Sequence, residues 1–385
     1  MRFEFSTANR ILFSPGATDE LAKGISELGC HAFLLVGRDL HRFDHVLDQL
    51  TSAGTTCEIF HVTGEPTTGI AQAAIASARR AQTQTVIAIG GGSVIDVGKV
   101  VAAMLTNEGE LSDYLEVVGT GKHLREEPVP YVAVPTTAGT GAEVTRNAVL
   151  RVPEHRVKVS MRSPLLLPRV ALVDPLLTHS MSPALTASTG LDALTQLIEP
   201  FVSSKANALT DGVCREGLHR AARALRRAFH DGGDAAARED MAIASLFSGL
   251  ALANAALGAV HGFAGPLGGM TDAPHGVICG KLLPFVIEAN VRALQARAPD
   301  SPALARFDEV ARILTGRDAT RASDGVSWIQ ELCAEFSLPG LSTYGLAQND
   351  LPAIVAQAKK ASSMKGNPIE LRDGELMSLL ENTMT

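Results

Sequence analysis

Two histidines and a carboxylate in the second half of the chain have the residue types and the spacing of a metal site. Asp192 and Gln196 lie four residues apart in GLDALTQLIEP and therefore share one face of a helix. His261 and His275 lie too far apart to meet on one straight helix, but the glycines and prolines between them can fold the chain back. Two neutral imidazoles and a carboxylate suit Zn²⁺ or Fe²⁺, and a purely structural role is the alternative for each histidine.

A glycine-rich turn in the first half has the form of a phosphate-binding loop. The apolar run TVIAIG leads into Gly90, Gly91, Gly92 and Ser93, and the next residues have helical spacing. Backbone N–H groups of such a turn and of the following helix N-terminus can face an anion closely. The pattern differs from GxGxxG, because Ile95 stands at the third glycine position, and from GxxxxGK[ST]. The turn predicts pyrophosphate binding, with a simple strand-to-helix turn as the alternative.

A second candidate loop is VPTTAGTGAEVT at 134–145, where an apolar run ends in Thr136 and Thr137. Hydroxyl groups and free amides here could line the same ligand site. In open parallel sheets, ligands bind at the carboxyl ends of the strands, which is where both loops are expected. Together the two loops predict a dinucleotide.

The elements that must position these loops alternate in type over the first 180 residues. Strands alternating with helices predict a parallel, doubly wound sheet, and we therefore expect an α/β dinucleotide-binding domain over residues 1–181. The apolar runs that predict its strands are 31–37, 57–64, 85–90, 131–137 and 171–175.

After Pro183 the strand pattern stops and long segments rich in alanine and leucine follow. We expect an all-helical domain over residues 182–385 that carries the metal and substrate groups. The segments that predict its helices are 184–203, 206–230, 234–259, 277–296, 303–315, 322–336 and 347–363.

Composition excludes several classes of protein. Hydrophobic residues make up 46% and charged residues 19% of the 385 residues, which excludes an intrinsically disordered chain. The net charge is −7 with the signs interspersed, so a nucleic-acid or anionic-membrane partner is not expected. The five widely spaced cysteines fit free thiols in a reducing compartment, and the amino terminus does not have the pattern of a signal peptide. The cytoplasm is therefore the expected location.

One stretch, from Met241 to Met270, is long enough to cross a membrane and carries no ionisable side chain except His261. Alanine and glycine dominate it where a lipid-facing helix would show leucine, isoleucine and phenylalanine. We therefore predict a buried central helix here and no membrane span.

Five motifs, in this order and at this spacing, resemble the iron-containing (group III) alcohol dehydrogenase family, which includes relatives of glycerol dehydrogenase, maleylacetate reductase and dehydroquinate synthase. The resemblance covers nearly the whole chain, and it implies a cleft between the two domains where a nicotinamide meets a small alcohol or aldehyde. The motifs are GGGSVIDVGK, VPTTAGTGAEVT, LVDP, TGLDALTQLIEP and HGFAGPLGGMTDAPHG.

The resemblance also implies roles for individual residues. It assigns the pyrophosphate to Gly90, Gly91, Gly92 and Ser93, and it puts Thr136 and Thr137 beside the phosphates and the nicotinamide ribose. It puts Asp96 and Lys158 near the nicotinamide and the substrate. Its four metal-ligand positions fall on Asp192, Gln196, His261 and His275.

The chain departs from the family pattern at two positions. The family usually has a histidine four residues after the aspartate, whereas this chain has Gln196, a weak neutral ligand. Its metal-binding dehydrogenases also commonly have a second histidine four residues after the first in the HG motif, and here that residue is Gly265. A proton relay through that imidazole is therefore absent.

The chemistry that the resemblance implies is hydride transfer between nicotinamide C4 and a carbonyl carbon, with negative charge developing on the oxygen. A divalent metal held by Asp192, His261 and His275 could stabilise that oxygen as a Lewis acid. Without a metal, His261, His275 or Lys158 could instead donate a hydrogen bond or a proton. The retained aspartate and histidines favour the metal.

Cofactor choice depends on the residue that ends the FLLVG run. Many NAD-using relatives have an aspartate there, which accepts hydrogen bonds from the ribose 2′-hydroxyl. This chain has Gly37 followed by Arg38, and the absence of a carboxylate beside a cation favours NADP over NAD.

Three alternative functions remain at this point. One is a metal-independent NAD(P)H-dependent keto-acid reductase resembling maleylacetate reductase, and a second is a lyase resembling dehydroquinate synthase. The third is a fold that binds dinucleotide without catalysis. A homodimer is the expected assembly, because dimers are frequent in the family that the chain resembles.

Overall fold

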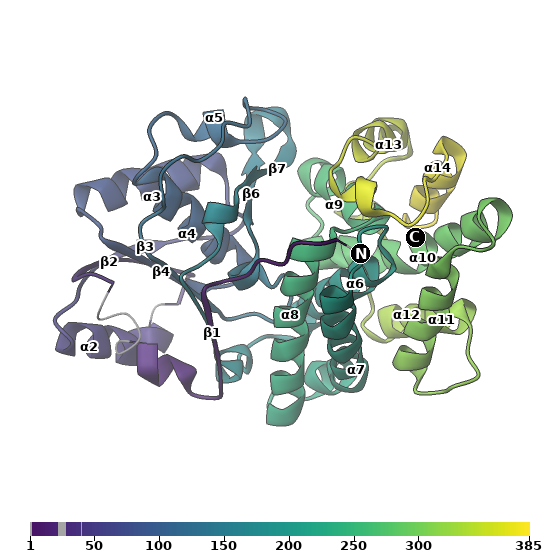
Figure 1. Ribbon diagram of the computed structural model, residues 1–385, viewed down its shortest axis with the longest axis horizontal. Coiled ribbons are helices and arrows are strands. Elements are labelled where there is room, and N and C mark those ends of the chain that lie inside the picture. Colours follow the sequence, from purple (N-terminus) through teal and green to yellow (C-terminus); the bar gives the residue numbers. More distant parts are fainter. Residues whose placement is uncertain (1, 22–27, 40) are drawn as a thin grey trace. The chain divides into compact units, whose positions relative to one another are not determined.

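The computed structural model describes residues 2–21, 28–39 and 41–385. The chain divides into two compact units, and we call them the sheet unit and the helical unit (Figure 1). The sheet unit comprises Ser6–Thr137 and Gly141–Ser180. The helical unit comprises Met181–Thr385 together with Met1–Phe5 and the short segment Ala138–Thr140.

The sheet unit is built on a six-stranded sheet with the strand order β1-β8-β5-β4-β2-β3, in which every neighbouring pair is parallel. This confirms the predicted parallel sheet. Every residue of β4, β5 and β8 is buried, as expected for central strands that are covered on both faces. The strands span Arg10–Phe13 (β1), His31–Val36 (β2), Thr56–His61 (β3), Thr85–Gly90 (β4), Tyr131–Pro135 (β5) and Val170–Val173 (β8).

Successive side chains of the central strands feed two separate cores, because they point to opposite faces of the sheet. Val86 and Ala88 of β4 pack in one core with residues of α3 and α4, whereas Ile87 and Ile89 pack in the other with residues of α2. The helices of this unit are Asp44–Ser52 (α2), Thr68–Arg80 (α3), Gly92–Met104 (α4) and Leu111–Tyr114 (α5).

The sequence analysis missed two features of the sheet unit. One is the edge strand β1, and the other is an antiparallel hairpin of β6 (Asn147–Val152) and β7 (Val157–Arg162). Burial alternates along β6, and Asn147 and Arg151 keep its apolar residues from forming the longer aliphatic run that marked the other strands.

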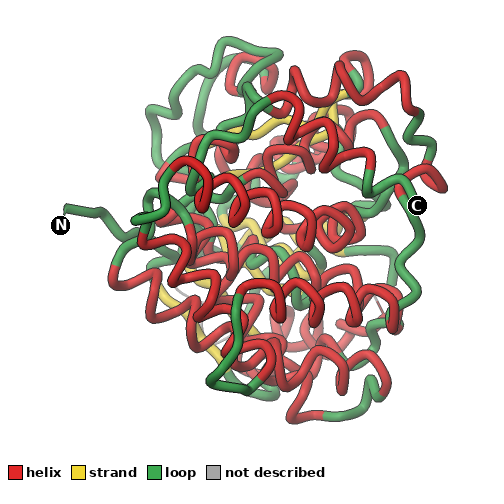
Figure 2. Tube along the Cα trace, turned by 90° about the vertical axis from the view of Figure 1, so that its right-hand side faces the viewer, coloured by secondary structure: helices red, strands yellow, loops and turns green. Residues whose placement is uncertain are grey.

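The helical unit contains no strand residue anywhere from 181 to 385, which confirms the predicted all-helical region (Figure 2). Side-chain caps fix several helix starts, among them Ser182 before α6, where the hydroxyl accepts from the Leu185 N–H. The helices are Pro183–Val202 (α6), Ala208–His230 (α7), Ala235–Ala255 (α8), Ala259–Met270 (α9), His275–Arg297 (α10), Pro302–Thr315 (α11), Ala322–Glu335 (α12), Leu351–Ala358 (α13) and Asp373–Glu381 (α14).

The prediction of one central helix through residues 241–270 is wrong. The chain breaks at residues 256–258, and α8 and α9 meet at an angle of 102°. Ala256 has a positive φ of 58° with a ψ of 176°, and Gly258 directly precedes α9 at a position where a Cβ would lie 2.8 Å from Glu199 Oε1. Within the described part of the chain, no single helix is both long and apolar enough to cross a membrane, although the bent α8–α9 pair would pass that test jointly.

The carboxyl-terminal prediction also needs correction. Residues 347–363 hold only the short helix α13 between single turns, and α14 was missed. Short 3-10 helices complete the fold at Ala17–Glu20 (η1), His41–Phe43 (η2), Ala142–Val144 (η3), Pro153–His155 (η4), Pro164–Leu166 (η5), Pro175–Thr178 (η6), Leu341–Tyr344 (η7), Gln348–Asp350 (η8) and Ser363–Gly366 (η9).

Candidate active site

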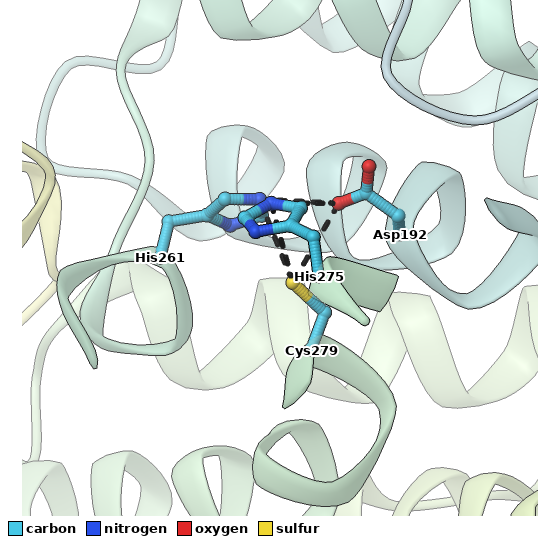
Figure 3. Close-up of side chains that lie close together, drawn as sticks. All are labelled: Asp192, His261, His275 and Cys279. Carbon is cyan, nitrogen blue, oxygen red and sulfur yellow. Dashed lines mark hydrogen bonds and ion pairs between the residues drawn. The ribbon is translucent and has the colours of Figure 1, made fainter. Parts of the chain in front are cut away.

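Four metal-ligating side chains converge in the helical unit (Figure 3). Asp192 Oδ1 lies 3.3 Å from His261 Nε2 and 3.5 Å from His275 Nε2. The sulfur of Cys279 lies 3.6 Å from the same Asp192 oxygen and 3.8 Å from each of the two histidine nitrogens. The structure thus brings together three of the four predicted ligand residues and adds a thiol that the sequence analysis missed.

The helix break between α8 and α9 and the tight packing of α10 place these side chains. His261 lies in the first turn of α9, and His275 is the first residue of α10, with Cys279 one turn later on the same face. Gly276 permits the approach of α10 to α6, because a Cβ there would lie 1.8 Å from the carbonyl oxygen of Ser188. The side chain of His275 is 39% exposed, so solvent reaches the cluster from its side.

Glu199 holds His261 in place from the opposite side. Its Oε2 lies 2.6 Å from His261 Nδ1, and its Oε1 accepts a hydrogen bond of 2.7 Å from the N–H of Val260. With Nδ1 donating to this carboxylate, Nε2 is the ring nitrogen that faces the cluster and that a metal would bind after displacing its proton. Glu199 was missed, although its spacing of seven residues from Asp192 puts both on one face of α6.

The neighbours of Asp192 favour the ionised form of its carboxyl group. Burial raises the pKa of this carboxyl, but the positive charge of His275 and the hydrogen bond from His261 outweigh it, and the net pKa lies below the ordinary value. A hydrogen bond from Gln196 acts in the same direction. The carboxylate is therefore ionised at neutral pH.

His261 and the thiol of Cys279 both keep their protons in the metal-free protein. Burial lowers the pKa of His261, but the charge of Cys279 and hydrogen bonds to Asp192, Cys279 and Glu199 raise it well above the ordinary value. Burial raises the pKa of the Cys279 thiol to about 12, against the opposing charge of His261. A metal ion would have to displace both protons, as metal binding to such ligands generally does.

Gln196, the fourth predicted ligand, is buried one helical turn after Asp192. Its Nε2 faces the carbonyl oxygen of Gly139 at 3.5 Å, and its Oε1 is a buried oxygen without a hydrogen-bond partner. Gly265, the second departure from the family pattern, has no atom within 4 Å of the position that a Cβ would take.

The predicted phosphate loop lies where the direction of the chain across the sheet reverses. From β3 the chain crosses β2 to reach β4, and such a switch point is where open α/β sheets bind ligands. Gly91 precedes α4 without any side-chain cap, which leaves backbone N–H groups of the first turn free for an anion. Gly90 must be glycine, because a Cβ would lie 2.4 Å from Val94 Cγ2. Gly92 and Ser93 open the helix.

The two threonines lie directly beside this turn. The N–H of Thr136 donates to the carbonyl oxygen of Gly90, and the side chain of Thr137 lies 3.3 Å from the position of a Cβ on Gly91. The loops after β4 and β5 therefore form one surface in the sheet unit, as the sequence predicts. After Thr137 the chain leaves this unit, and residues 138–140 belong to the helical unit.

Gly37 and Arg38 follow β2, on the other side of the switch point. The carbonyl oxygen of Gly37 lies 3.0 Å from His61 Nδ1, and a Cβ on Gly37 would meet no atom within 4 Å. Arg38 is exposed and, among the residues that the structure describes, forms no ion pair. The next residue, Asp39, is an exposed carboxylate in the same loop.

Asp96 and Lys158 have protein partners in the sheet unit. Asp96 Oδ2 accepts a hydrogen bond of 3.0 Å from the N–H of Val149, and its Oδ1 lies 3.6 Å from Lys99 Nζ. Burial raises the pKa of Asp96, although Lys99 and the Val149 N–H oppose it. Lys158 Nζ lies 2.5 Å from Glu65 in the loop that follows β3, at the same edge of the sheet as the phosphate loop.

The LVDP motif has a structural explanation. The buried carboxylate of Asp174 accepts hydrogen bonds from the N–H groups of Gly16, Thr18 and Leu176, and one of 2.7 Å from the Thr18 hydroxyl. It therefore joins the segment after β1 to the end of β8 and caps η6.

Models of known protein families match the sequences of both units. The family of iron-containing alcohol dehydrogenases matches residues 8–175, and the carboxyl-terminal model of the Fe-containing alcohol dehydrogenase family matches residues 186–384. The chain is 34% identical to 1,3-propanediol dehydrogenase of Klebsiella pneumoniae, over 98% of this chain and 97% of that one.

Two solved structures are similar over nearly their full length. A crystal structure of 1,3-propanediol oxidoreductase superposes with a TM-score of 0.91 at 33% identity and covers 100% of both chains. Sulfoacetaldehyde reductase from Bifidobacterium kashiwanohense, in complex with NAD⁺, superposes with a TM-score of 0.87 at 27% identity and covers 100% of this chain and 99% of the other. The chain belongs to the iron-containing alcohol dehydrogenase family, which uses NAD(P) and a divalent metal, and it is a nicotinamide-dependent alcohol dehydrogenase.

Proposed function

We propose that Asp192, His261 and His275 hold a divalent metal ion that assists hydride transfer between the nicotinamide and a small alcohol or aldehyde. The observation that carries the proposal is the convergence of one carboxylate oxygen and two imidazole nitrogens within 4.8 Å of one another. These donors are the ones that Zn²⁺ and Fe²⁺ accept, and the buried, unpartnered Oε1 of Gln196 offers a further polar atom nearby. The residues present therefore fit a metal.

A bound divalent cation supplies Lewis-acid stabilisation of the negative charge that develops on the substrate oxygen. The chain's own residues prepare the site for it. Asp192 brings the negative charge that partly neutralises a cation, and Glu199 fixes the ring of His261 so that Nε2 faces inward. His275 stands on the side that solvent reaches, which is the side from which a small substrate can approach the cluster.

The nicotinamide cofactor is assigned to the sheet unit, with its pyrophosphate at Gly90, Gly91, Gly92 and Ser93. The uncapped amino terminus of α4 supports this assignment, because its N–H groups and helix dipole favour an anion. Thr136 and Thr137 supply hydroxyl groups beside the same turn.

We further propose that the cofactor is NADP. The exposed guanidinium of Arg38, next to a glycine where a carboxylate would repel a 2′-phosphate, supports this choice. Arg38→Ala should lower kcat/KM for NADPH by about tenfold or more, the value of a charge-assisted hydrogen bond, and leave that for NADH unchanged. Asp39→Asn is the matched variant, and a gain for NADPH alone would mean that Asp39 opposes the phosphate. Equal loss for both cofactors in Arg38→Ala would contradict the proposal.

The curated relatives favour alcohols and aldehydes over the keto acids of a maleylacetate-type reductase. If the protein worked without a metal, a side chain would have to donate the proton. His275 would then be the best placed of the three candidates, since its side chain is 39% exposed, against 7% for His261 and 12% for Lys158.

The test is elemental analysis of the purified protein for iron, zinc, nickel and manganese, together with turnover on an alcohol and aldehyde panel before and after chelation. We expect about one metal equivalent per chain, its loss in His275→Ala, and its retention in His219→Ala, which changes an exposed histidine of α7 in the same unit. Full turnover without metal, or a keto acid as the sole substrate, would contradict the proposal.

The assembly and the location are also proposed. A homodimer is expected because two-fold dimers are by far the commonest oligomers, and sedimentation analysis tests it. A cytoplasmic location fits the five cysteines, all of which are free thiols.

A further inference from the structure

We infer that Cys279, and not Gln196, is the fourth protein ligand of the metal, so that this chain has an Asp–His–His–Cys site suited to Zn²⁺. The inference rests on the proposed function, because it requires a metal at Asp192, His261 and His275. It concerns the position where the chain departs from the family pattern.

The distances between the four ligand atoms fit a tetrahedral zinc site. Zn–N and Zn–O bonds of about 2.0–2.1 Å place two such donors about 3.3–3.4 Å apart, and a Zn–S bond of about 2.3 Å places sulfur about 3.6 Å from each of them. In the structure, the carboxylate oxygen of Asp192 lies 3.3 and 3.5 Å from the two imidazole nitrogens, and the sulfur lies 3.6, 3.8 and 3.8 Å from the three other atoms. Five of the six distances between the ligand atoms are thus within about 0.2 Å of those of a tetrahedral zinc site, and all four atoms lie within 4.8 Å of one another.

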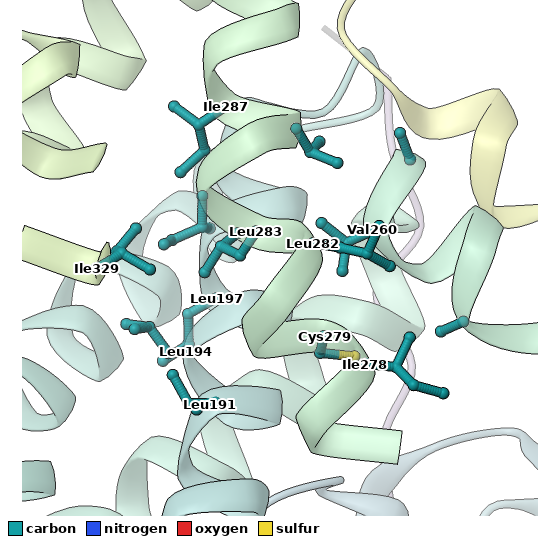
Figure 4. Close-up of a cluster of buried hydrophobic side chains, with 14 of the residues drawn as sticks. Leu191, Leu194, Leu197, Val260, Ile278, Cys279, Leu282, Leu283, Ile287 and Ile329 are labelled. Carbon is teal, nitrogen blue, oxygen red and sulfur yellow. The ribbon is translucent and has the colours of Figure 1, made fainter. Parts of the chain in front are cut away.

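The surroundings of Cys279 differ from those of a cysteine that serves only to fill a core. Along α10 it stands at the end of a row of apolar side chains that includes Leu282, Leu283 and Ile287 (Figure 4). Its sulfur nevertheless points to three polar atoms of the cluster. Cys333, by comparison, makes its hydrogen bond to the backbone carbonyl of Gly280.

Gln196 is chemically weaker than Cys279 for the same task. Its amide donates to Asp192 and faces the carbonyl oxygen of Gly139, so its N–H groups are directed at acceptors of the protein. A neutral amide oxygen is also not among the usual ligands of Zn²⁺, which are thiolate, imidazole and carboxylate. Gln196 therefore orients Asp192 from outside the metal's coordination sphere.

A thiolate changes the chemistry of the site. Asp192 and Cys279 together bring two negative charges, which balance those of a divalent ion in a buried site. Thiolate ligands select Zn²⁺ or Co²⁺ over harder ions, and a site with oxygen, nitrogen and sulfur donors in tetrahedral array favours zinc. The presence of Gln196 at the usual histidine position is thus offset by the sulfur of Cys279 from α10.

The test uses the full-length protein loaded with Co²⁺, which reports metal binding and thiolate ligation by separate absorption bands. The visible ligand-field bands show that cobalt is bound, and a sulfur-to-cobalt charge-transfer band in the near ultraviolet shows a thiolate ligand. We expect both in the wild type. Cys279→Ser should lose the charge-transfer band, keep weakened ligand-field bands and bind Co²⁺ at least about tenfold less tightly, since even outer-shell partners contribute about 10–100-fold.

Two matched variants separate the alternatives. Cys333→Ser changes the neighbouring thiol, and Gln196→Ala removes the amide, and both should keep the charge-transfer band. Ligand-field bands without a charge-transfer band in the wild type, or a band that survives in Cys279→Ser, would overturn the inference and leave the metal proposal intact. No cobalt bound to the wild type would overturn both.

A measurement on the wild type alone guards against a variant that fails to fold. X-ray absorption at the zinc edge should show one sulfur at about 2.3 Å in the first shell of the zinc-loaded protein. A first shell of only nitrogen and oxygen would overturn the assignment of Cys279.

Discussion

A buried cluster of charged side chains lies in each of the two units, and these two clusters differ in where the positive charge comes from. In the sheet unit the cation is Lys99, whose ammonium is fully buried and donates to the Thr145 hydroxyl and the Asn147 carbonyl. Asp96 lies 3.6 Å away, and the buried Glu143 also acts on it. In this cluster the side chains of the protein supply both the positive and the negative charge.

In the helical unit, Asp192 and Glu199 face histidines instead of a lysine. An imidazole becomes a metal ligand when it gives up its proton, whereas the buried ammonium of Lys99, which donates two hydrogen bonds and lies 3.6 Å from Asp96, has no such second role. The difference teaches that burial of charge does not by itself mark a functional site. The cluster to test for function is the one whose donor atoms lie close enough together to bind a single ion.

The largest effect should follow from Asp192→Ala, which removes the charge of the helical-unit cluster. Loss of Lewis-acid assistance worth several kcal/mol should lower kcat by about three to four orders of magnitude, with loss of bound metal. Steady-state kinetics with elemental analysis checks this. Asp96→Ala is the control. It should lower the free energy of unfolding and keep the bound metal. Loss of metal in that variant would show that the two clusters do not differ in their role in metal binding.

Lys99→Met should have the largest effect on stability. It leaves the carboxylates of Asp96 and Glu143 buried without their cation, and removal of one partner of a buried ion pair costs about 3–5 kcal/mol. Denaturant unfolding of the metal-free protein measures it. The double variant Lys99→Met/Glu143→Gln should recover part of the loss, and a fully additive result would show that Lys99 and Glu143 are not coupled.

Local sequence patterns predict the parts of the fold that local physics decides. The strand at 85–90 and the turn at Gly90 follow from an apolar run that ends in glycines, and the phosphate surface follows from the meeting of strand ends in a parallel sheet. The helix break at Ala256 does not, since an alanine rarely adopts a positive φ and the neighbouring residues have helical composition. Likewise, only every second residue of β6 is buried, and apolar and polar residues alternate along β7.

For the site, the predicted start of one helix decided which ligand residues could be identified from the sequence. The spacing of four residues identified Asp192 and Gln196 on one helix face, and the same spacing joins His275 to Cys279. The predicted helix began at residue 277, which left His275 in a loop and concealed its partner, whereas α10 begins at His275. Which way the amide of Gln196 turns depends on Gly139 and Asp192, and sequence spacing carries no information about that.

A pH-dependent effect on stability is expected from Glu143 in the sheet-unit cluster. Burial raises its pKa from 4.5 to about 7, although Lys99 opposes the shift. The folded protein therefore binds a proton more tightly than the unfolded chain, so this group's contribution is fully present below pH 4.5 and is lost as the pH rises to about 7. At about 1.4 kcal/mol per pKa unit, the loss above pH 7 amounts to about 3 kcal/mol.

Glu143→Gln mimics the protonated side chain and should remove that loss. The variant should be more stable than the wild type by about 2–3 kcal/mol at pH 8, and the difference should shrink towards zero near pH 4.5. Urea unfolding across this range measures it. A difference that does not vary with pH would mean that Glu143 is ionised throughout and that Lys99 neutralises it fully.

The smallest effect should follow from Glu199→Gln. This variant alters only the residue that orients the metal ligand His261 and leaves the ligands of the helical-unit cluster unchanged. Glu199 accepts from both the Val260 N–H and His261 Nδ1, and a glutamine has one acceptor oxygen for these two donors. If the amide N–H faces Nδ1, the ring proton moves to Nε2, the atom that must bind the metal. Metal affinity should therefore fall by about 10–100-fold, and kcat should recover at saturating metal, because the ligands themselves remain. Competition with a chelating dye gives the affinity, and a kcat that stays low when metal saturates would show that Glu199 takes part in the chemistry instead of positioning His261.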